Sequence, residues 1–194
     1  MTQEISTTPD VGTTAEIGNF STLGLHPSVL AAITAVGYEE PSPIQTKSIP
    51  LIMAGHDMIG QAQTGTGKTA AFALPILSRI DAARREAQVL VLAPTRELAL
   101  QVATAFESFA AQMSSVNVVA IYGGAPMGPQ LKAIRNGAQV IVATPGRLVD
   151  HLSRNGGLLS TIKFLVLDEA DEMLKLGFMD DLEVIFNAMP DERQ

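Results

Sequence analysis

Short runs of apolar residues alternate along the chain with longer stretches in which apolar residues recur at helical spacing. The runs lie at residues 58–60, 89–93, 116–122, 140–143 and 164–167. They are rich in Val, Ile and Leu without polar alternation, which is typical of strands buried on both faces of a parallel sheet. Helical spacing predicts helices between the runs, at residues 68–80, 96–112, 131–135, 147–153 and 178–189. The alternation predicts an α/β domain with a mostly parallel, doubly wound sheet and helices on both faces.

The N-terminal part of the chain does not follow this pattern. Residues 20–55 predict two short helices, at 26–36 and 44–54. Residues 1–18 are polar and Thr-rich, so we expect a flexible tail there and a folded domain from residue 19 to residue 194. The tail has no basic segment followed by an apolar run, which excludes a signal peptide. No apolar stretch is long enough to predict a membrane span.

The amino-acid composition narrows the class of protein further. The 194 residues are 46% hydrophobic and 17% charged, which is typical of one globular domain. There is no Cys, which excludes a disulfide framework, a thiolate zinc site and a cysteine nucleophile, and fits a cytoplasmic protein. The net charge of −7 argues mildly against a nucleic-acid partner, because proteins that neutralise many phosphates usually show a basic surface.

A Gly-rich loop follows the first predicted strand. Its residues are Ala62, Gln63, Thr64, Gly65, Thr66, Gly67, Lys68 and Thr69, with Ala in place of the first Gly of a phosphate loop. Gly65 and Gly67 allow backbone N–H groups to point at phosphate oxygens. Lys68 can reach the β- and γ-phosphates of a nucleotide, and the Thr69 hydroxyl can bind Mg²⁺. The alternative is a Gly-rich turn without a ligand, but the strand before it and the helix after it favour the phosphate loop.

Three carboxylates follow the last predicted strand, at Asp168, Glu169 and Asp171. Asp168 can hold Mg²⁺ opposite Thr69, and Glu169 can orient or deprotonate the water that attacks the γ-phosphate. The alternative is that these acids only cap the next helix, since acidic residues are favoured in a first turn. Because ligands bind at the carboxyl ends of parallel strands, we expect the phosphate loop and the acids to meet at one edge, with Lys68, Asp168 and Glu169 as catalytic residues.

Several motifs, in this order, resemble those of the DEAD-box ATP-dependent RNA helicases. Asp168-Glu169-Ala170-Asp171 spells the family's name, and Gly37 to Gln45 resembles its Q motif. Motif Ia, the GG element and motif Ib are matched at Pro94-Thr95-Arg96-Glu97-Leu98-Ala99, Gly123-Gly124 and Thr144-Pro145-Gly146-Arg147. The resemblance covers residues 20–194. Residues 172–178 further resemble the bacterial cold-shock, ribosome-assembly branch.

The resemblance implies a RecA-like domain with ATP and Mg²⁺ as cofactors. It implies that Gln45 pairs with the adenine edge, whose donor and acceptor suit a side-chain amide. Phe20 stands at the spacing of the family's upstream aromatic residue and would pack against the base, with Tyr38 at the same site. Asp171 would bond to the family's motif III and so couple the nucleotide to domain closure.

The resemblance also implies an RNA-binding surface that contacts the sugar-phosphate backbone and reads no base edges. The residues implied are Pro94, Thr95, Arg96, Gly123, Gly124, Thr144, Pro145, Gly146 and Arg147. Such a surface uses backbone amides and helix N-termini with few basic side chains, so it need not make the whole domain basic. This answers the objection from net charge.

The family's motif III and second RecA-like domain, with arginines that stabilise transition-state charge, are absent from these residues. We therefore expect this chain to bind ATP and ADP weakly, to hydrolyse ATP very slowly and not to unwind RNA. Three alternatives remain open: another phosphate-loop enzyme such as a small kinase, a non-enzymatic nucleotide-gated binding module, and a DNA helicase of related fold.

The three histidines, His26, His56 and His151, lack metal-ligand spacing and are predicted to be surface or capping residues.

Overall fold

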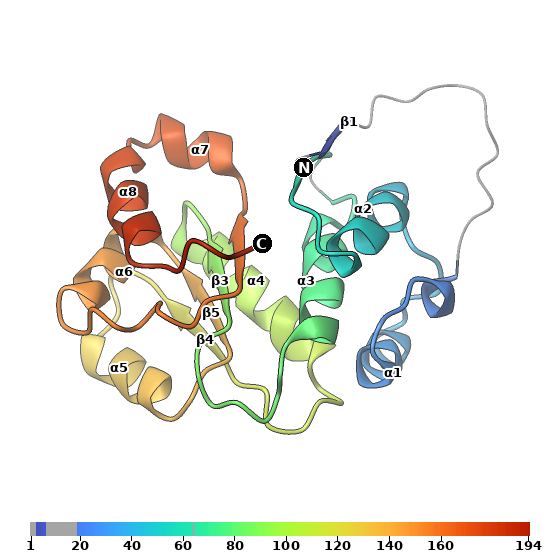
Figure 1. The fold of residues 1–194 in the computed structure, drawn as a ribbon, viewed down its shortest axis with the longest axis horizontal. Coiled ribbons are helices and arrows are strands. Elements are labelled where there is room, and N and C mark those ends of the chain that lie inside the picture. Colours follow the sequence, from blue (N-terminus) through green and yellow to red (C-terminus); the bar gives the residue numbers. More distant parts are fainter. Residues whose placement is uncertain (1–2, 7–18, 64) are drawn as a thin grey trace. The chain divides into compact units, whose positions relative to one another are not determined.

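The computed structural model describes residues 3–6, 19–63 and 65–194 (Figure 1). The chain forms two compact units. The first unit comprises residues 1–79 and 108–113, and the second comprises residues 80–107 and 114–194. The predicted tail at residues 1–18 lies outside the described residues except for 3–6, and Thr64 of the predicted phosphate loop also lies outside them.

Helices dominate the first unit. It contains the 3₁₀ turn η1 (Phe20–Thr22) and the helices α1 (Pro27–Ala35), α2 (Pro43–Met53) and α3 (Lys68–Arg79), and α2 packs along α3. The His26 ring nitrogen Nδ1 accepts a hydrogen bond from the Ser28 N–H at 3.2 Å and caps α1, as predicted for this histidine. The helices predicted at 26–36, 44–54 and 68–80 are therefore confirmed, with ends within two residues of those expected.

Strand β2 (Met58–Gln61), which leads into the Gly-rich loop, pairs in parallel with β1 (Gln3–Ser6), with Gln3 opposite Met58. This differs from the expected tail at residues 3–6 and from the expectation of one sheet. An open strand edge offers unpaired N–H and C=O groups that any extended segment can satisfy, and apolar patterning does not reveal such pairing.

A four-stranded parallel sheet forms the centre of the second unit, in the order β4-β5-β3-β6. Its strands are β3 (Val89–Leu92), β4 (Val118–Ile121), β5 (Val140–Ala143) and β6 (Phe164–Leu167). The helices that follow are α4 (Arg96–Phe109), α5 (Met127–Arg135), α6 (Pro145–Leu152), α7 (Ala170–Lys175) and α8 (Met179–Asn187). The last two residues of α4 belong to the first unit. Strand–helix alternation in this unit is thus confirmed, while α7 was not predicted.

Burial on both faces was predicted for every strand, and this is correct only for β3 and β5, whose residues are all buried. Strand β4 lies at one edge of the sheet and alternates between partly and fully buried residues. On β6, at the other edge, Leu167 is 38% exposed, and three of the four residues of β2 are exposed. A continuous apolar run therefore does not distinguish a central strand from an edge strand.

The core of the second unit lies on one face of its sheet, where β3, β4 and β5 pack against α6, α7 and α8. Its residues include Leu90, Leu92, Ile121, Ile141, Leu148, Met173, Leu182 and Ile185. Neighbouring residues of a strand point to opposite faces, so Val91 and Val142 point away from this cluster. Both are also fully buried, which means that the sheet is covered on both faces.

A buried amide ties together the loops at the amino ends of these strands. Gln139 Nε2 shares its hydrogens among the carbonyl oxygens of Ala82, Arg84 and Ser115, at 3.2, 2.9 and 3.0 Å. Its Oε1 accepts from the Asn117 N–H at 2.9 Å. These hydrogen bonds join the loops at the amino ends of the strands. In parallel sheets ligands bind at the carboxyl ends, where the predicted site residues lie.

Candidate functional site

The Gly-rich loop of the first unit joins β2 to the N-terminus of α3, which begins at Lys68. Gly65 and Gly67 have φ angles of 83° and 87°, in the left-handed region that glycine adopts without a steric penalty. The Thr66 hydroxyl donates to the Gln63 carbonyl at 2.8 Å and stabilises the turn. Lys68 is half-buried at the helix N-terminus, as is Thr69, while Ala62 precedes the turn. Two left-handed glycines followed directly by a helix N-terminus are a local geometry that suits an anion.

Gln45 and Ser42, at the start of α2, hold this loop from one side. Gln45 Oε1 accepts from the Ser42 N–H at 2.8 Å, and its Nε2 donates to the Gly67 carbonyl at 3.1 Å. The Ser42 hydroxyl donates to the Thr66 carbonyl at 2.8 Å. Gln45 is 3% exposed, and a Cβ added to Gly67 would overlap its Nε2. The predicted adenine-binding residue thus lies against the predicted phosphate loop, with one N–H and one acceptor position of its amide still available.

Three aromatic rings of the first unit pack edge to face. The Phe20 and Tyr38 ring centroids are 6.0 Å apart at 65°, and those of Tyr38 and Phe109 are 5.7 Å apart at 89°. Phe20 is 4% exposed, so its ring lies within the protein. Two residues predicted at the nucleotide site therefore contact each other. Phe109 was not predicted as their neighbour, because its sequence signal was only helical periodicity.

The acidic residues of the second unit follow β6 directly. The Asp168 N–H donates to the Leu92 carbonyl at 2.9 Å and continues the pairing with β3. Glu169 has φ 53° and ψ 50°, a left-handed conformation that costs a non-glycine residue about 1–2 kcal/mol. Such backbone strain is concentrated at functional sites, where it fixes the direction of a side chain. The strain agrees with the role predicted for Glu169 but is not specific to it, since Ser115, outside the predicted sites, has φ 71°.

Asp171, on the first turn of α7, is exposed. Its Oδ2 lies 3.3 Å from Lys175 Nζ, and Lys175 also lies 2.6 Å from Glu172 Oε1. The hydrogen bond from Lys175 holds the pKa of Asp171 below its usual value, and the bonds to Glu172 and Asp171 raise the pKa of Lys175. Because these groups are exposed, the pairs contribute little to stability.

Residues of the predicted RNA surface come together at the carboxyl ends of β3 and β4. The Arg96 guanidinium lies 4.9 Å from the centroid of the Tyr122 ring, a cation–π contact. Pro94 is buried after β3, and the Thr95 hydroxyl oxygen accepts from the Leu98 N–H at 3.2 Å and caps α4. Gly123 and Gly124 form the exposed turn after Tyr122, and Gly124 has φ 80°.

Motif Ib residues begin α6 at the carboxyl end of β5. The Thr144 N–H donates to the Ile121 carbonyl at 2.9 Å and places the helix start beside β4. Pro145 and Gly146 form the first turn of α6. Arg147 Nη1 donates to the Ala125 carbonyl at 2.8 Å, so this arginine is joined to the turn that follows Gly123 and Gly124. The neighbours Tyr122 and Ala125 were not predicted from the sequence.

The two predicted Mg²⁺ ligands belong to different units, Thr69 to the first and Asp168 to the second. Within the part of the chain that the structure describes, no group of three His, Asp or Glu side chains is placed to hold a metal ion. The prediction for His151 is wrong, because this residue is completely buried on the inner face of α6.

The parallel sheet, the Gly-rich loop at a helix N-terminus and the strained glutamate after a strand define a RecA-like α/β domain. The chain belongs to the DEAD/DEAH box helicase family, whose model matches residues 42–194.

Two relatives and one solved structure support this assignment. The chain is 55% identical over 96% of its length to an ATP-dependent RNA helicase DeaD of Mycobacterium tuberculosis, and 53% identical over 90% to that of Escherichia coli K12. It spans 33% and 28% of those two proteins. A crystal structure of a DEAD box protein from Methanococcus jannaschii matches 91% of the chain, and 48% of that protein, with a TM-score of 0.84 and 41% identity. No helix among the described residues is long and apolar enough to cross a membrane.

Proposed function

We propose that this chain is the ATP- and RNA-binding first domain of an ATP-dependent RNA helicase that separates short RNA duplexes. The observation that carries the proposal is the set of hydrogen bonds from Gln45 and Ser42 to the backbone of Thr66 and Gly67. They attach a buried side-chain amide, which suits adenine, to a loop that suits phosphates. The relatives' shared name, ATP-dependent RNA helicase, supports the same reading.

The residues of the first unit fit ATP. Gly67 has no room for a Cβ beside Gln45, so Gln45 can lie against the loop backbone only with glycine there. In the proposal, Ala62 to Thr69, including Thr64, surround the phosphates with backbone N–H groups, and Lys68 neutralises the β- and γ-phosphates. Gln45 pairs with adenine, and Phe20 and Tyr38 form the apolar side of the base site.

Glu169 is proposed to orient and deprotonate the attacking water, and its left-handed backbone fixes the direction of the carboxylate. Bound ATP with Mg²⁺ supplies a γ-phosphoryl group whose charge the metal partly neutralises. Thr69 and Asp168 would hold that ion. Asp171 is proposed to exchange its exposed Lys175 partner for a group of motif III in the parent protein.

RNA is proposed to bind along the carboxyl ends of β3, β4 and β5 through its sugar-phosphate backbone. Arg96 and Arg147 are held by the Tyr122 ring and the Ala125 carbonyl, so their charges are positioned before the ligand arrives. The N-termini of α4 and α6 add backbone N–H groups for phosphate oxygens. No base edge is read in this arrangement, so binding is independent of RNA sequence.

Alone, the chain is proposed to bind nucleotide but to hydrolyse it very slowly and not to unwind RNA. The arginines that stabilise transition-state charge belong to a second RecA-like domain of the parent protein, which is the chain's proposed partner. A cytoplasmic location is also part of the proposal, because the absence of Cys fits a reducing compartment.

Nucleotide binding is tested by titrating a fluorescent ATP analogue against the chain and two lysine variants. Lys68→Ala should weaken binding by at least about tenfold, since it removes a charge-assisted bond to phosphate. Lys47→Ala removes an exposed lysine from α2 and is the matched control. Equal affinities of the two variants would contradict the assignment of the phosphate loop. Gln45→Ala should reduce the preference for ATP over GTP.

RNA binding is tested by fluorescence anisotropy with a single-stranded RNA and a DNA of the same sequence. Arg96→Ala and Arg147→Ala should each weaken RNA binding several-fold, whereas Arg84→Ala, whose exposed side chain pairs with Glu86, should not. Tighter binding of the DNA would favour a DNA helicase of related fold. Phosphoryl transfer from ATP to a small acceptor would favour a small kinase.

A further inference from the structure

The turn at residues 122–125, which follows β4 and contains both glycines of the proposed RNA surface, is held by side chains at both ends. At its start, Gln130 Nε2, on α5, donates to the Tyr122 carbonyl at 3.1 Å. At its end, Arg147 Nη1, on α6, donates to the Ala125 carbonyl at 2.8 Å. The turn is therefore fixed by side chains of two helices that come later in the sequence.

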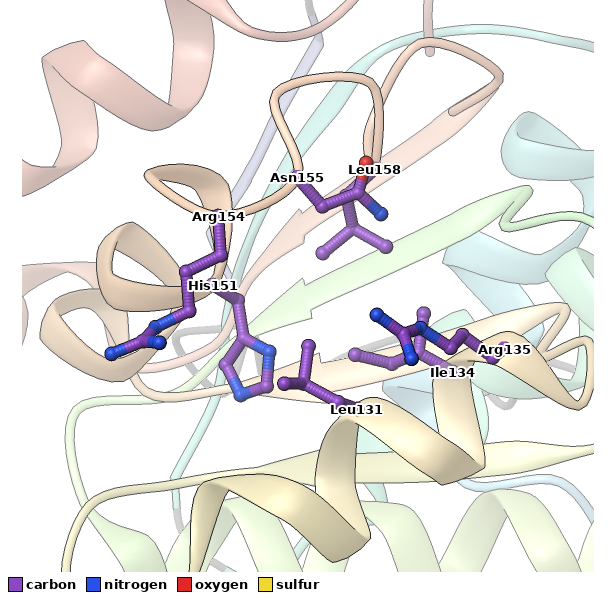
Figure 2. A pocket seen from close by; sticks show the side chains of 7 residues that line it. All are labelled: Leu131, Ile134, Arg135, His151, Arg154, Asn155 and Leu158. Carbon is purple, nitrogen blue, oxygen red and sulfur yellow. The ribbon is translucent and has the colours of Figure 1, made fainter.

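Gln130 is itself held by His151, near the end of α6. His151 Nε2 lies 3.1 Å from Gln130 Oε1, and both side chains are buried. The Tyr122 carbonyl can only accept, so Gln130 turns its N–H toward it and its oxygen toward His151, whose Nε2 carries the hydrogen. Figure 2 shows the His151 ring beside Leu131, the residue that follows Gln130 in α5. Because Arg147 belongs to the same helix as His151, α6 holds both ends of the turn, one of them through Gln130.

His151 is a costly residue at its position. The buried face of α6 is otherwise apolar, with Pro145, Leu148 and Leu152. Burial and then the charge of Arg147 lower the pKa of His151, so its ring is neutral near pH 7 and has a single N–H. Its Nδ1 is the one buried side-chain N or O atom without a partner in the described part of the chain, and such an atom costs stability. What the histidine contributes beyond an apolar residue is the N–H that orients the amide on α5.

The position of Tyr122 matters because its ring holds an arginine of the proposed RNA surface. The exposed Arg96 has its guanidinium 4.9 Å from the centroid of this ring. The guanidinium also lies against the turn, since a Cβ added to Gly124 would be 3.9 Å from Arg96 Nη1. A long side chain that is oriented before the ligand arrives loses less conformational freedom upon binding. The orientation of this arginine therefore depends on the backbone that Gln130 holds.

We propose that Gln130 and His151 are positioning residues for RNA binding, which act through the backbone of Tyr122 to orient Arg96. Neither side chain contacts RNA, since both are buried. This inference rests on the proposed function, because it takes Arg96 to be part of the RNA surface. It goes beyond that function by extending the RNA surface to a buried polar pair on α5 and α6 that contributes affinity without touching the ligand.

The first test compares RNA affinity with thermal stability in variants of the whole chain, with a single-stranded RNA as the probe. His151→Leu removes the unpaired Nδ1 but leaves Gln130 Oε1 without a donor, so the melting temperature should change little. RNA binding should nevertheless weaken about threefold, because the amide on α5 is no longer oriented. His151→Gln retains a donor at the position of Nε2 and should bind RNA like the native chain.

Gln139→Ala is the matched control for this comparison. It removes another buried amide of the second unit, one that bonds to the loops at the amino ends of the strands. It should lower the melting temperature and leave RNA affinity unchanged, measured well below the melting temperature. RNA affinity that follows the melting temperature across all three variants would indicate a structural role alone and would overturn the proposal.

A double-mutant cycle with Arg96 tests the route of the effect. Gln130→Leu should weaken RNA binding about threefold in the native chain and have almost no further effect in an Arg96→Ala background. If Arg96→Ala weakens binding and the effect of Gln130→Leu adds to it in full, the positioning proposal fails while the RNA surface stands. If Arg96→Ala itself leaves RNA binding unchanged, the proposed RNA surface fails and the positioning proposal fails with it.

Discussion

Gly67→Ala should destabilise the first unit by about 2–3 kcal/mol, through two separate effects. Gly67 has φ 87°, where an L-residue with a Cβ pays about 1–2 kcal/mol. The new methyl group would overlap Gln45 Nε2 and would also lie 3.3 Å from Gln45 Cδ and 3.4 Å from the Ser42 hydroxyl. Gln45 must then move, and its hydrogen bond to the Gly67 carbonyl, worth about 1 kcal/mol, is lost.

Gly65→Ala separates the two effects, because Gly65 has φ 83° but nothing within 4 Å of an added Cβ. Thermal unfolding followed by circular dichroism should place the melting temperature of Gly67→Ala about 2–4 °C below that of Gly65→Ala, the shift expected for about 1 kcal/mol in a chain of this size. In a Gln45→Ala background the two glycine variants should be equally stable. Equal melting temperatures in the native background would refute this account of the contact between α2 and the loop.

Three further outcomes follow from contacts elsewhere in the chain. Gln139→Ala should cost about 1–3 kcal/mol in urea unfolding, because it removes a fully buried amide that bonds three part-buried carbonyl groups, whereas Gln101→Ala on the exposed face of α4 should cost almost nothing. Glu169→Gly should raise the stability by up to about 1 kcal/mol by relieving the left-handed strain, and should abolish ATP hydrolysis in the parent helicase. Because the Lys175 contact lowers the pKa of Asp171, its small stabilisation is present above the unfolded pKa and is lost as pH falls through the folded one. Asp171→Asn should therefore melt like the native chain in acid and slightly lower near neutrality, and added salt should remove the difference.

Strand positions were predictable because a parallel sheet requires apolar residues on both faces. The predictions for β5 and β6 are correct to the residue, and that for β3 within one. Edge exposure was not predictable, since the partners of a strand are set by the whole topology. Helix α7 was missed for a related reason. It is a single short segment between Glu169 and Leu176, and its three exposed or half-buried acidic and basic residues resemble a loop.

In the candidate site, too, features set by adjacent residues were predictable, and contacts between residues distant in sequence were not. Gly65, Gly67 and Lys68 form a local motif whose geometry depends on adjacent residues, so the sequence was sufficient to predict it. Tyr122 and Ala125 were missed because each acts through an arginine far away in sequence, Arg96 and Arg147.

His151 is a different kind of error, because a signal was present and not used. It stands three residues after Leu148 in a helix and next to Leu152, the spacing of the buried face of α6. The histidine was assigned by residue type to the surface, but its position in the helical period places it inside. The helical period was therefore the better guide to the burial of this residue.

A chain of net charge −7 that binds RNA should show a weak dependence of affinity on salt. The proposed surface has two cationic side chains that are held in place by contacts, those of Arg96 and Arg147. Each phosphate neutralised on a single strand contributes about −0.7 to the slope of log K against log salt concentration, so the expected slope is about −1.4. Backbone N–H groups at the starts of α4 and α6 contribute hydrogen bonds but displace few counterions. Anisotropy titrations of a single-stranded RNA between about 50 and 200 mM salt measure this slope. A slope steeper than about −4 would require many more cationic contacts, and would show that the RNA lies on a different surface from the one at the carboxyl ends of β3, β4 and β5.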